Sequence, residues 1–171
     1  MSETNTMGKL KRSAHLFYID ASFGAASPEW FLVGKDVEDM SIELNPDVSS
    51  TKNILDETSV EDNGYEPSVD VDTYYADPSD GKFYEKIKNI AMNRLTGEAC
   101  KTKVLEVLVD KTTGPFDAWQ EDAVIKPTSY GGAQGGVRIP YGVTFCGGRI
   151  QGTAAITADK KTPTFTAASD E

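Results

Sequence analysis

Hydrophobic and polar residues alternate along much of the chain, with the period of two that is typical of half-buried β-strands. Short runs of this kind are bounded by Gly, Pro, Ser or Asn, and about seven of them occur, most arranged as hairpins. The last run contains the pair Gly147–Gly148, which predicts a hairpin turn between two strands. The predicted strands lie at residues 14–21, 30–35, 37–44, 68–75, 102–111, 123–126 and, on either side of the glycine pair, 137–156.

One stretch changes to a helical period. Asp77 suits an N-cap, Pro78 suits the first helical position and Gly97 supplies a stop, so we predict one amphipathic helix over 78–96. Its apolar face is expected to cover a sheet through Phe83, Ile87, Ile90 and Leu95. The fold class predicted for the whole chain, 1–171, is a single mainly-β domain: an antiparallel β-sandwich or barrel with one flanking α-helix and a long inter-strand loop.

The long loop covers residues 46–67 and carries almost no apolar side chains. A compact domain rarely keeps a loop of this length unless the loop has a function. Its only aliphatic residues are Val48, Ile54, Leu55 and Val60. The two ends of the chain, 1–13 and 158–171, are polar and are expected to be flexible, with Phe165 as a possible anchor in the second of them.

Charge is distributed unevenly. The net charge is −10, and residues 36–80 contain fourteen acidic residues against the single base Lys52. Such a balance disfavours non-specific binding to nucleic acid, which needs Lys and Arg to neutralise phosphates. No apolar run reaches the roughly 18 residues needed to span a bilayer, and the N-terminus lacks a signal-peptide core. Cys100 and Cys146 fit neither a disulfide framework nor a zinc site.

No set of residues predicts catalysis. His15 is the only histidine, it has no nucleophile motif beside it, and a surface or inter-subunit contact is the favoured interpretation. Asp70 and Asp72 have the spacing of a metal-binding pair, but on an alternating strand two such carboxylates simply share a face. The glycine-rich stretch 128–138 lacks the strand–loop–helix context of a phosphate loop. We therefore expect no enzyme activity, no cofactor and no metal.

The order of elements resembles the tail tube protein of long-tailed bacteriophages. The likeness runs from about residue 14 to 157 and is carried by "IELNPDV", a long polar loop, "VDVDTYYADPSDGKFYEKI", an amphipathic helix and a glycine-rich final hairpin. The resemblance implies a small β-sandwich that assembles into hexameric rings. It also implies that the rings stack into a hollow tube whose inner sheets join into one β-barrel. The inner tube of a contractile bacteriocin or similar injection particle fits the same pattern.

The resemblance gives the long loop a role as an inter-subunit arm that docks on another copy through Val48, Ile54, Leu55 and Val60, with Ile54 and Leu55 foremost. The alternative is a mobile surface loop. It also implies that the strands beside the loop line the channel, so that Glu43, Asp70 and Asp72 face a lumen that DNA crosses without sticking. The alternative is that these acids face outside solvent. Arg149 would offset part of the lumen charge, and the pattern leaves its face open.

The implied partners are further copies of the chain, the tail initiator or baseplate, the tape measure and tail terminator proteins, a sheath in contractile particles, and passing DNA, with no membrane. The implied location is the tail of a virion assembled in a bacterial host's cytoplasm. Two other classes stay open. A carbohydrate-binding β-sandwich would stack sugars on Trp30 and Trp119, and a hydrolase would use a pair of the acidic residues.

Overall fold

The computed structural model describes residues 8–35 and 37–168, which form β-structure around one α-helix. The strands are β1 (His15–Asp20), β2 (Trp30–Val33), β3 (Ile42–Glu43), β4 (Pro46–Lys52), β5 (Thr58–Tyr65), β6 (Ser68–Val71), β7 (Lys101–Leu108), β8 (Phe116–Pro127), β9 (Tyr141–Ile156) and β10 (Pro163–Ala167). The helical elements are η1 (Arg12–Ala14), η2 (Pro78–Asp80), α1 (Lys82–Asn93) and η3 (Gly97–Cys100).

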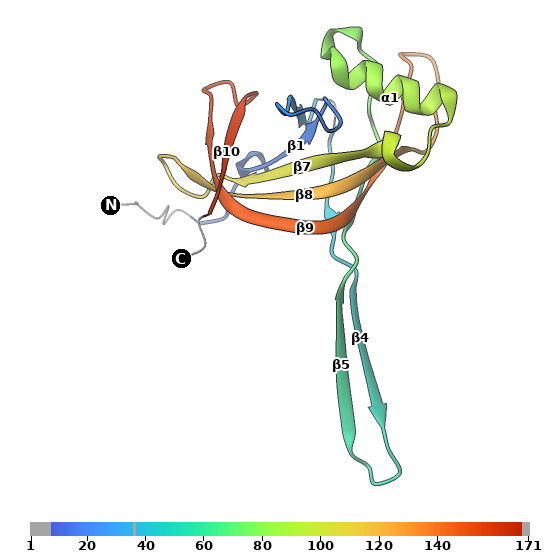
Figure 1. Cartoon of the computed structure of the whole chain (residues 1–171), viewed down its shortest axis with the longest axis vertical. Coiled ribbons are helices and arrows are strands. Elements are labelled where there is room, and N and C mark those ends of the chain that lie inside the picture. The colour runs from blue at the N-terminus through green and yellow to red at the C-terminus, as the bar shows by residue number, and fades with distance from the viewer. Residues whose placement is uncertain (1–7, 36, 169–171) are drawn as a thin grey trace.

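Eight of the strands form one curved antiparallel sheet. Its order is β2-β1-β7-β8-β9-β6-β3, and β10 pairs with the second half of β9. The sheet curls into a half-barrel, α1 flanks it, and the two-stranded ribbon β4–β5 leaves the body on the side away from α1 (Figure 1). The predicted fold class, an antiparallel β-sandwich or barrel with a flanking helix, is confirmed.

Both faces of the sheet are partly buried. Because successive side chains of a strand point to opposite faces, neighbouring residues belong to different core clusters. Under α1, Phe83 and Ile87 of the helix pack on Val69, Val104 and other residues of the sheet. A second cluster occupies the opposite face at the far end of the sheet. Leu105 belongs to it, although the adjacent residue Val104 belongs to the first cluster. The second cluster comprises Leu16, Tyr18, Leu105, Val107, Phe116, Ala118 and Ala154, with Trp30, Leu32, Val109, Ile156 and Phe165 packed against it.

The predicted start at residue 78 is a 3-10 turn, η2, and α1 itself begins at Lys82 and ends before the predicted residue 96. The Asp77 side chain accepts a hydrogen bond from the Ser79 backbone N–H and caps a 3-10 turn, and α1 follows from Lys82. Arg94 adopts a left-handed conformation and terminates α1, so the predicted end at residue 96 is wrong and Leu95 lies beyond the helix, half-buried. Among the described residues no helix is long and apolar enough to cross a membrane.

The glycine pair does not form a hairpin. β9 runs straight through Gly147 and Gly148, whose φ angles are 94° and 70°, and the register against β8 shifts beside them. Glycine tolerates these positive φ values, so the pair accommodates a bulge and not a turn. The prediction of two separate strands is therefore wrong, because β8 is twelve residues long and pairs with both halves of β9.

Two other predicted elements differ. The strand expected over 37–44 is reduced to β3, which has two residues. The C-terminal segment 158–171, expected to be flexible, contains β10, which pairs with β9 from Pro163 to Ala167 and packs Phe165 on the second core cluster. The predicted flexible N-terminus, 1–13, lies outside the described residues up to position 7, and η1 begins at Arg12.

Gly152 allows β10 to approach β9. A Cβ at this position would lie 2.2 Å from the Thr166 carbonyl oxygen and 2.8 Å from the Phe165 ring. We expect Gly152→Ala to displace β10 and to lower the free energy of unfolding by about 2 kcal/mol, as overpacking does. Urea unfolding measures this change, and Gly34→Ala is the control because a Cβ there meets nothing within 4 Å. Equal stability of the two variants would contradict the close approach of β10.

The buried hydroxyl of Tyr141 has no hydrogen-bond partner among the described residues, whereas the Tyr18 hydroxyl donates to the Lys160 carbonyl oxygen at 2.5 Å. Removing an unpaired buried polar group costs no hydrogen bond, so Tyr141→Phe should leave the unfolding free energy unchanged or slightly higher. Tyr18→Phe should lower it by about 1 kcal/mol. Thermal and urea unfolding check both, and a clear loss in Tyr141→Phe would mean that its hydroxyl is satisfied.

Candidate functional site

The predicted loop 46–67 is a β-hairpin that projects from the domain. β4 and β5 pair with each other from Pro46↔Tyr65 to Lys52↔Thr58 and form a sheet of their own (Figure 1). At the root, the Asn45 side chain donates to the Glu66 carbonyl oxygen at 3.0 Å. The segment predicted as an extended inter-strand loop is therefore extended and is a paired β-hairpin. Alternating Val, Ser and Thr supplied the strand propensity.

The hairpin has two different faces, because residues directly opposite one another on antiparallel strands share a face. Val48 pairs with Asp62 and Val60 pairs with Ser50, so the two valines lie on the same face, both more than half exposed. The other face is polar throughout and carries Ser49, Thr51, Ser59 and Glu61. The structure thus brings together two of the four predicted arm residues on one side of the ribbon.

The other two arm residues form the tip. The Asn53 side-chain oxygen accepts hydrogen bonds from the backbone N–H groups of Leu55 at 2.8 Å and Glu57 at 3.0 Å. These bonds hold the turn in one conformation and present Ile54 and Leu55 outward, with exposed fractions of 98% and 71%. The ordered turn thus presents two aliphatic side chains to water.

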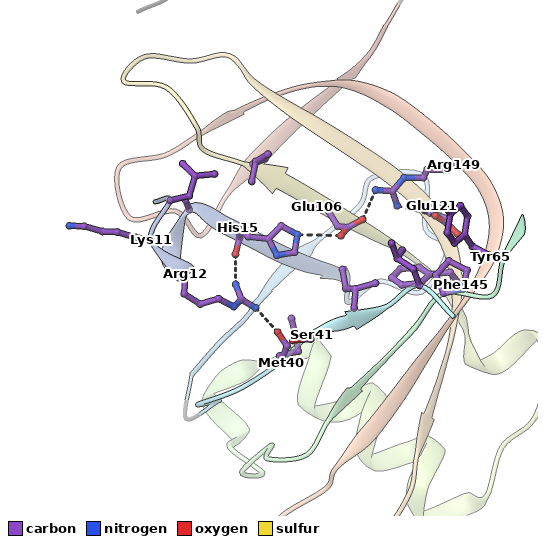
Figure 2. A pocket seen from close by; sticks show the side chains of 16 residues that line it. Lys11, Arg12, His15, Met40, Ser41, Tyr65, Glu106, Glu121, Phe145 and Arg149 are labelled. Carbon is purple, nitrogen blue, oxygen red and sulfur yellow. Dashed lines mark hydrogen bonds and ion pairs between the residues drawn. The ribbon is translucent and has the colours of Figure 1, made fainter. Parts of the chain in front are cut away.

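A pocket of about 700 Å³ lies at the root of the hairpin (Figure 2). η1, β1, β3 and the strands β7, β8 and β9 contribute to its walls. Arg12 closes one side by donating to the His15 and Met40 carbonyl oxygens, at 3.0 and 2.9 Å. The apolar wall is formed by Leu10, Met40, Ile42, Leu44, Leu108 and Phe145.

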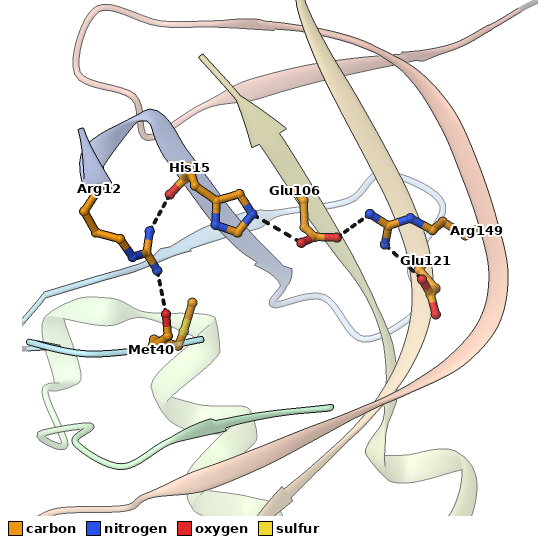
Figure 3. A network of polar contacts seen from close by, with 6 residues as sticks. All are labelled: Arg12, His15, Met40, Glu106, Glu121 and Arg149. Atoms are coloured by element: carbon orange, nitrogen blue, oxygen red, sulfur yellow. Dashed lines mark hydrogen bonds and ion pairs between the residues drawn. The ribbon is translucent and has the colours of Figure 1, made fainter. Parts of the chain in front are cut away.

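A chain of polar side chains, from His15 through Glu106 and Arg149 to Glu121, forms the polar wall (Figure 3). His15 Nε2 lies 3.2 Å from Glu106 Oε1, and Arg149 bridges two glutamates, at 2.7 Å from Glu106 and 3.0 Å from Glu121. Both glutamates are buried, and the Arg149 guanidinium also lies over the Trp119 ring. Each buried carboxylate is therefore paired, which is the condition for burying charge without a large penalty.

Burial and pairing act in opposite directions on this network. Burial would raise the pKa of Glu106, but the hydrogen bond from His15 and the charge of Arg149 outweigh it and hold the pKa below the ordinary glutamate value. For Arg149, burial would lower the pKa, and the two glutamates overcome it and raise the pKa. Glu106 and Arg149 are thus charged at neutral pH, and the network joins β1, β7, β8 and β9 across the sheet.

Three of the four residues predicted to line the lumen, Glu43, Asp70 and Asp72, are exposed. Glu43 and Asp70 lie on the same face of the sheet. Val69 and Val71 point into the core under α1, so Asp70 between them points to the opposite face of the sheet. Glu43 pairs with Ser68, which lies two residues before Asp70 on β6, so Glu43 and Asp70 share that face. Asp72 follows the strand and is exposed.

Arg149 does not join these acids. Its contacts with Glu106 and Glu121 place it in the pocket, on the same side of the sheet as α1. The acidic face also carries exposed lysines at Lys101 and Lys103, which alternate with core residues of β7. The face predicted to line a channel is therefore of mixed charge, with exposed acids on β3, on β6 and on β8, where Asp122 pairs with Lys103. Leu44, which follows β3, is 53% exposed.

The pocket network was not predicted as a site. His15 was expected to make a surface or inter-subunit contact, and it contacts Glu106 within its own chain. The available signal was Glu106, a lone charge in the apolar run of β7, which implies a buried partner. Among the described residues, no group of three or more His, Cys, Asp or Glu side chains is arranged to hold a metal.

The fold is similar to that of a solved sheath/tube terminator of an extracellular contractile injection system, PVC, in its extended state. The TM-score is 0.52 at 9% sequence identity, and the alignment covers 85% of this chain and 98% of that chain. The tube-terminating cap of the anti-feeding prophage aligns with a TM-score of 0.48 at 12% identity over 97% and 96% of the two chains. No protein-family model and no curated protein matches the chain. The chain has the fold of phage-tail-like, tube-related proteins, as the resemblance in its sequence predicted.

The Glu106 network should make the free energy of unfolding depend on pH. Because its pKa is lower in the folded chain than in the unfolded chain, Glu106 stabilises the fold fully above about pH 5 and loses this contribution as the pH falls through its folded pKa. We expect Glu106→Gln to lower the unfolding free energy by about 2 kcal/mol at pH 7, with the gap from the native chain narrowing towards pH 3.

Urea unfolding at a series of pH values measures this gap. Glu98→Gln is the control, because Glu98 pairs with Lys101 at 2.9 Å on an exposed surface, where loss of the pair should cost at most about 0.5 kcal/mol. A constant gap for Glu106→Gln from pH 7 to pH 3 would show that the carboxylate's ionisation contributes no stability.

Proposed function

We propose that the protein is a non-enzymatic structural subunit of a phage-tail-like tube, which assembles into hexameric rings that stack around a channel. The observation that carries the proposal is the projecting hairpin, which presents apolar side chains with no place to bury them on its own domain. A lone two-stranded hairpin is marginally stable in water, and contact with a partner is the usual remedy. The fold shared with a sheath/tube terminator supports this assignment.

The edges of the sheet support assembly as well. Within the described residues β2 pairs only with β1, and β3 pairs only with β6, so both ends of the strand order present unpaired backbone groups. Open edges favour pairing with another chain unless they are covered. In a ring of identical copies, one edge of each subunit pairs with the other edge of the next subunit. The ring closes when the rotation between successive subunits adds up to a full turn.

The face of β3 and β6 that carries Glu43 and Asp70 is the candidate channel wall. Repetition of these acids in every subunit would repel a DNA backbone and keep it from binding during passage. Lys101 and Lys103 on β7 offset part of that field and Asp122 on β8 adds to it, so the lumen proposed here is weakly anionic. A headless particle with this lumen would conduct ions and other solutes.

A second candidate is the terminator of such a tube. The similarity to a sheath/tube terminator favours it, because that protein, by its name, sits where the tube ends. The two candidates differ in number of copies: a tube subunit forms many stacked rings, whereas a terminator forms one ring on a pre-existing tube. Electron microscopy of the purified protein, alone and with a tail initiator complex, separates them by whether long hollow filaments or single rings appear.

Assembly should depend on the hairpin tip. We expect the double substitution Ile54→Asp with Leu55→Asp to abolish stacked assemblies in negative-stain images and in sedimentation. It should shift the unfolding free energy by no more than about 0.5 kcal/mol, because both side chains are exposed in the single chain.

Ser59→Asp is the matched control, since it adds a charge on the polar face of the same hairpin. It should assemble as the unmodified chain does. Filaments of normal length from the tip variant would remove the hairpin from the assembly. A native chain that stays monomeric at every concentration, with and without an initiator, would refute the proposed function itself.

A further inference from the structure

The tip of the hairpin cannot reach the pocket at its own root. Leu44, Tyr65 and Pro67 line the pocket and flank the hairpin where it leaves the sheet. β5 is eight residues long, so at roughly 3.3 Å per residue the turn lies about 25 Å from that root. A single chain therefore presents an apolar projection at one end of the ribbon and an apolar cavity at the other.

The cavity suits the projection in size and chemistry. Its volume of about 700 Å³ lies within the roughly 300–1,000 Å³ of pockets that enclose small-molecule-sized groups. Ile54 and Leu55 are aliphatic, and six residues of the wall are apolar. The charged residues of the opposite wall are paired with one another, so they do not require a charged guest.

Charge is complementary between the two surfaces. The hairpin from Pro46 to Tyr65 carries five acidic residues and one lysine, a net charge of −4, and Asp56 and Glu57 adjoin its tip. The segment at the mouth of the pocket, residues 8–14, carries Lys9, Lys11 and Arg12 and no acid. Lys11 and Arg12 themselves line the pocket. Complementary charge of this kind steers association and fixes its orientation.

We propose that Ile54 and Leu55 of one copy bind in the root pocket of a second copy. The inference rests on the proposed function and adds the acceptor site for the arm. Projection and cavity are different surfaces, so the contact is heterologous and leaves one unused tip and one unused pocket at the ends of any row of copies. The ribbon separates the two surfaces by about 25 Å, so each contact displaces the next copy along the hairpin. This contact stacks rings and does not close them.

Leu44 and Val137 provide a matched pair of test positions. Both are aliphatic and 53% exposed, and Leu44 lines the pocket whereas Val137 belongs to another surface. In a Cys146→Ser background, which removes the exposed native thiol, Ile54→Cys protein is mixed with Leu44→Cys protein or with Val137→Cys protein and oxidised. Docking should raise the local thiol concentration and give about tenfold more disulfide-linked dimer with Leu44→Cys. Equal yields from the two mixtures would overturn the proposal.

A second pair of variants tests the pocket without a cross-link. Leu44→Arg should block stacking while leaving the unfolding free energy unchanged, and Val137→Arg should stack normally. Negative-stain images distinguish the possible failures. Hollow filaments from Leu44→Arg as long as those of the native chain would refute the pocket as acceptor and leave the tube function standing. A native chain that forms neither rings nor filaments would refute the tube function and this inference with it.

Discussion

A two-stranded ribbon has no third strand and no helix on which to bury its side chains. In this molecule the constraint applies to the hairpin β4–β5. The hairpin β4–β5 orders its backbone through its own ladder and through Asn53, yet it leaves Val48 and Val60 on one face and Ile54 and Leu55 at the tip in water. Burying these aliphatic groups is worth roughly 25 cal/mol per Å² of apolar surface. That free energy becomes available only through another chain.

The rest of the fold holds the hairpin in a defined place. α1 covers one end of the curved sheet, the second cluster and β10 cover the opposite face at the other end, and the root of the hairpin emerges between β3 and β6. The paired charges of Glu106, Arg149 and Glu121 tie three strands together beside that root. Because its base is held by these contacts, the hairpin keeps its tip at a fixed distance from the sheet.

The proposed assembly uses two kinds of unsatisfied surface. Open sheet edges at β2 and β3 offer backbone groups for pairing around a ring, and the hairpin and its pocket offer apolar contact between rings. End-capping and repeated stacking are the two proposed roles that these surfaces allow. The difference lies in whether both surfaces are used on every copy.

The sequence by itself determined the local elements. Alternation placed most strands, and Asp77 with the helical period placed the 3-10 turn η2 and the helix α1 that follows it. The isolation of Val48, Ile54, Leu55 and Val60 in a polar segment marked the arm. Tertiary structure decided whatever depends on long-range register. The turn propensity of Gly147–Gly148 was overridden because β8 runs along both halves of β9. Glu106, Glu121 and Arg149 lie far apart in the chain, and only the pairing of β7, β8 and β9 brings their charges together, because side-chain contact across a sheet follows strand register and not sequence spacing.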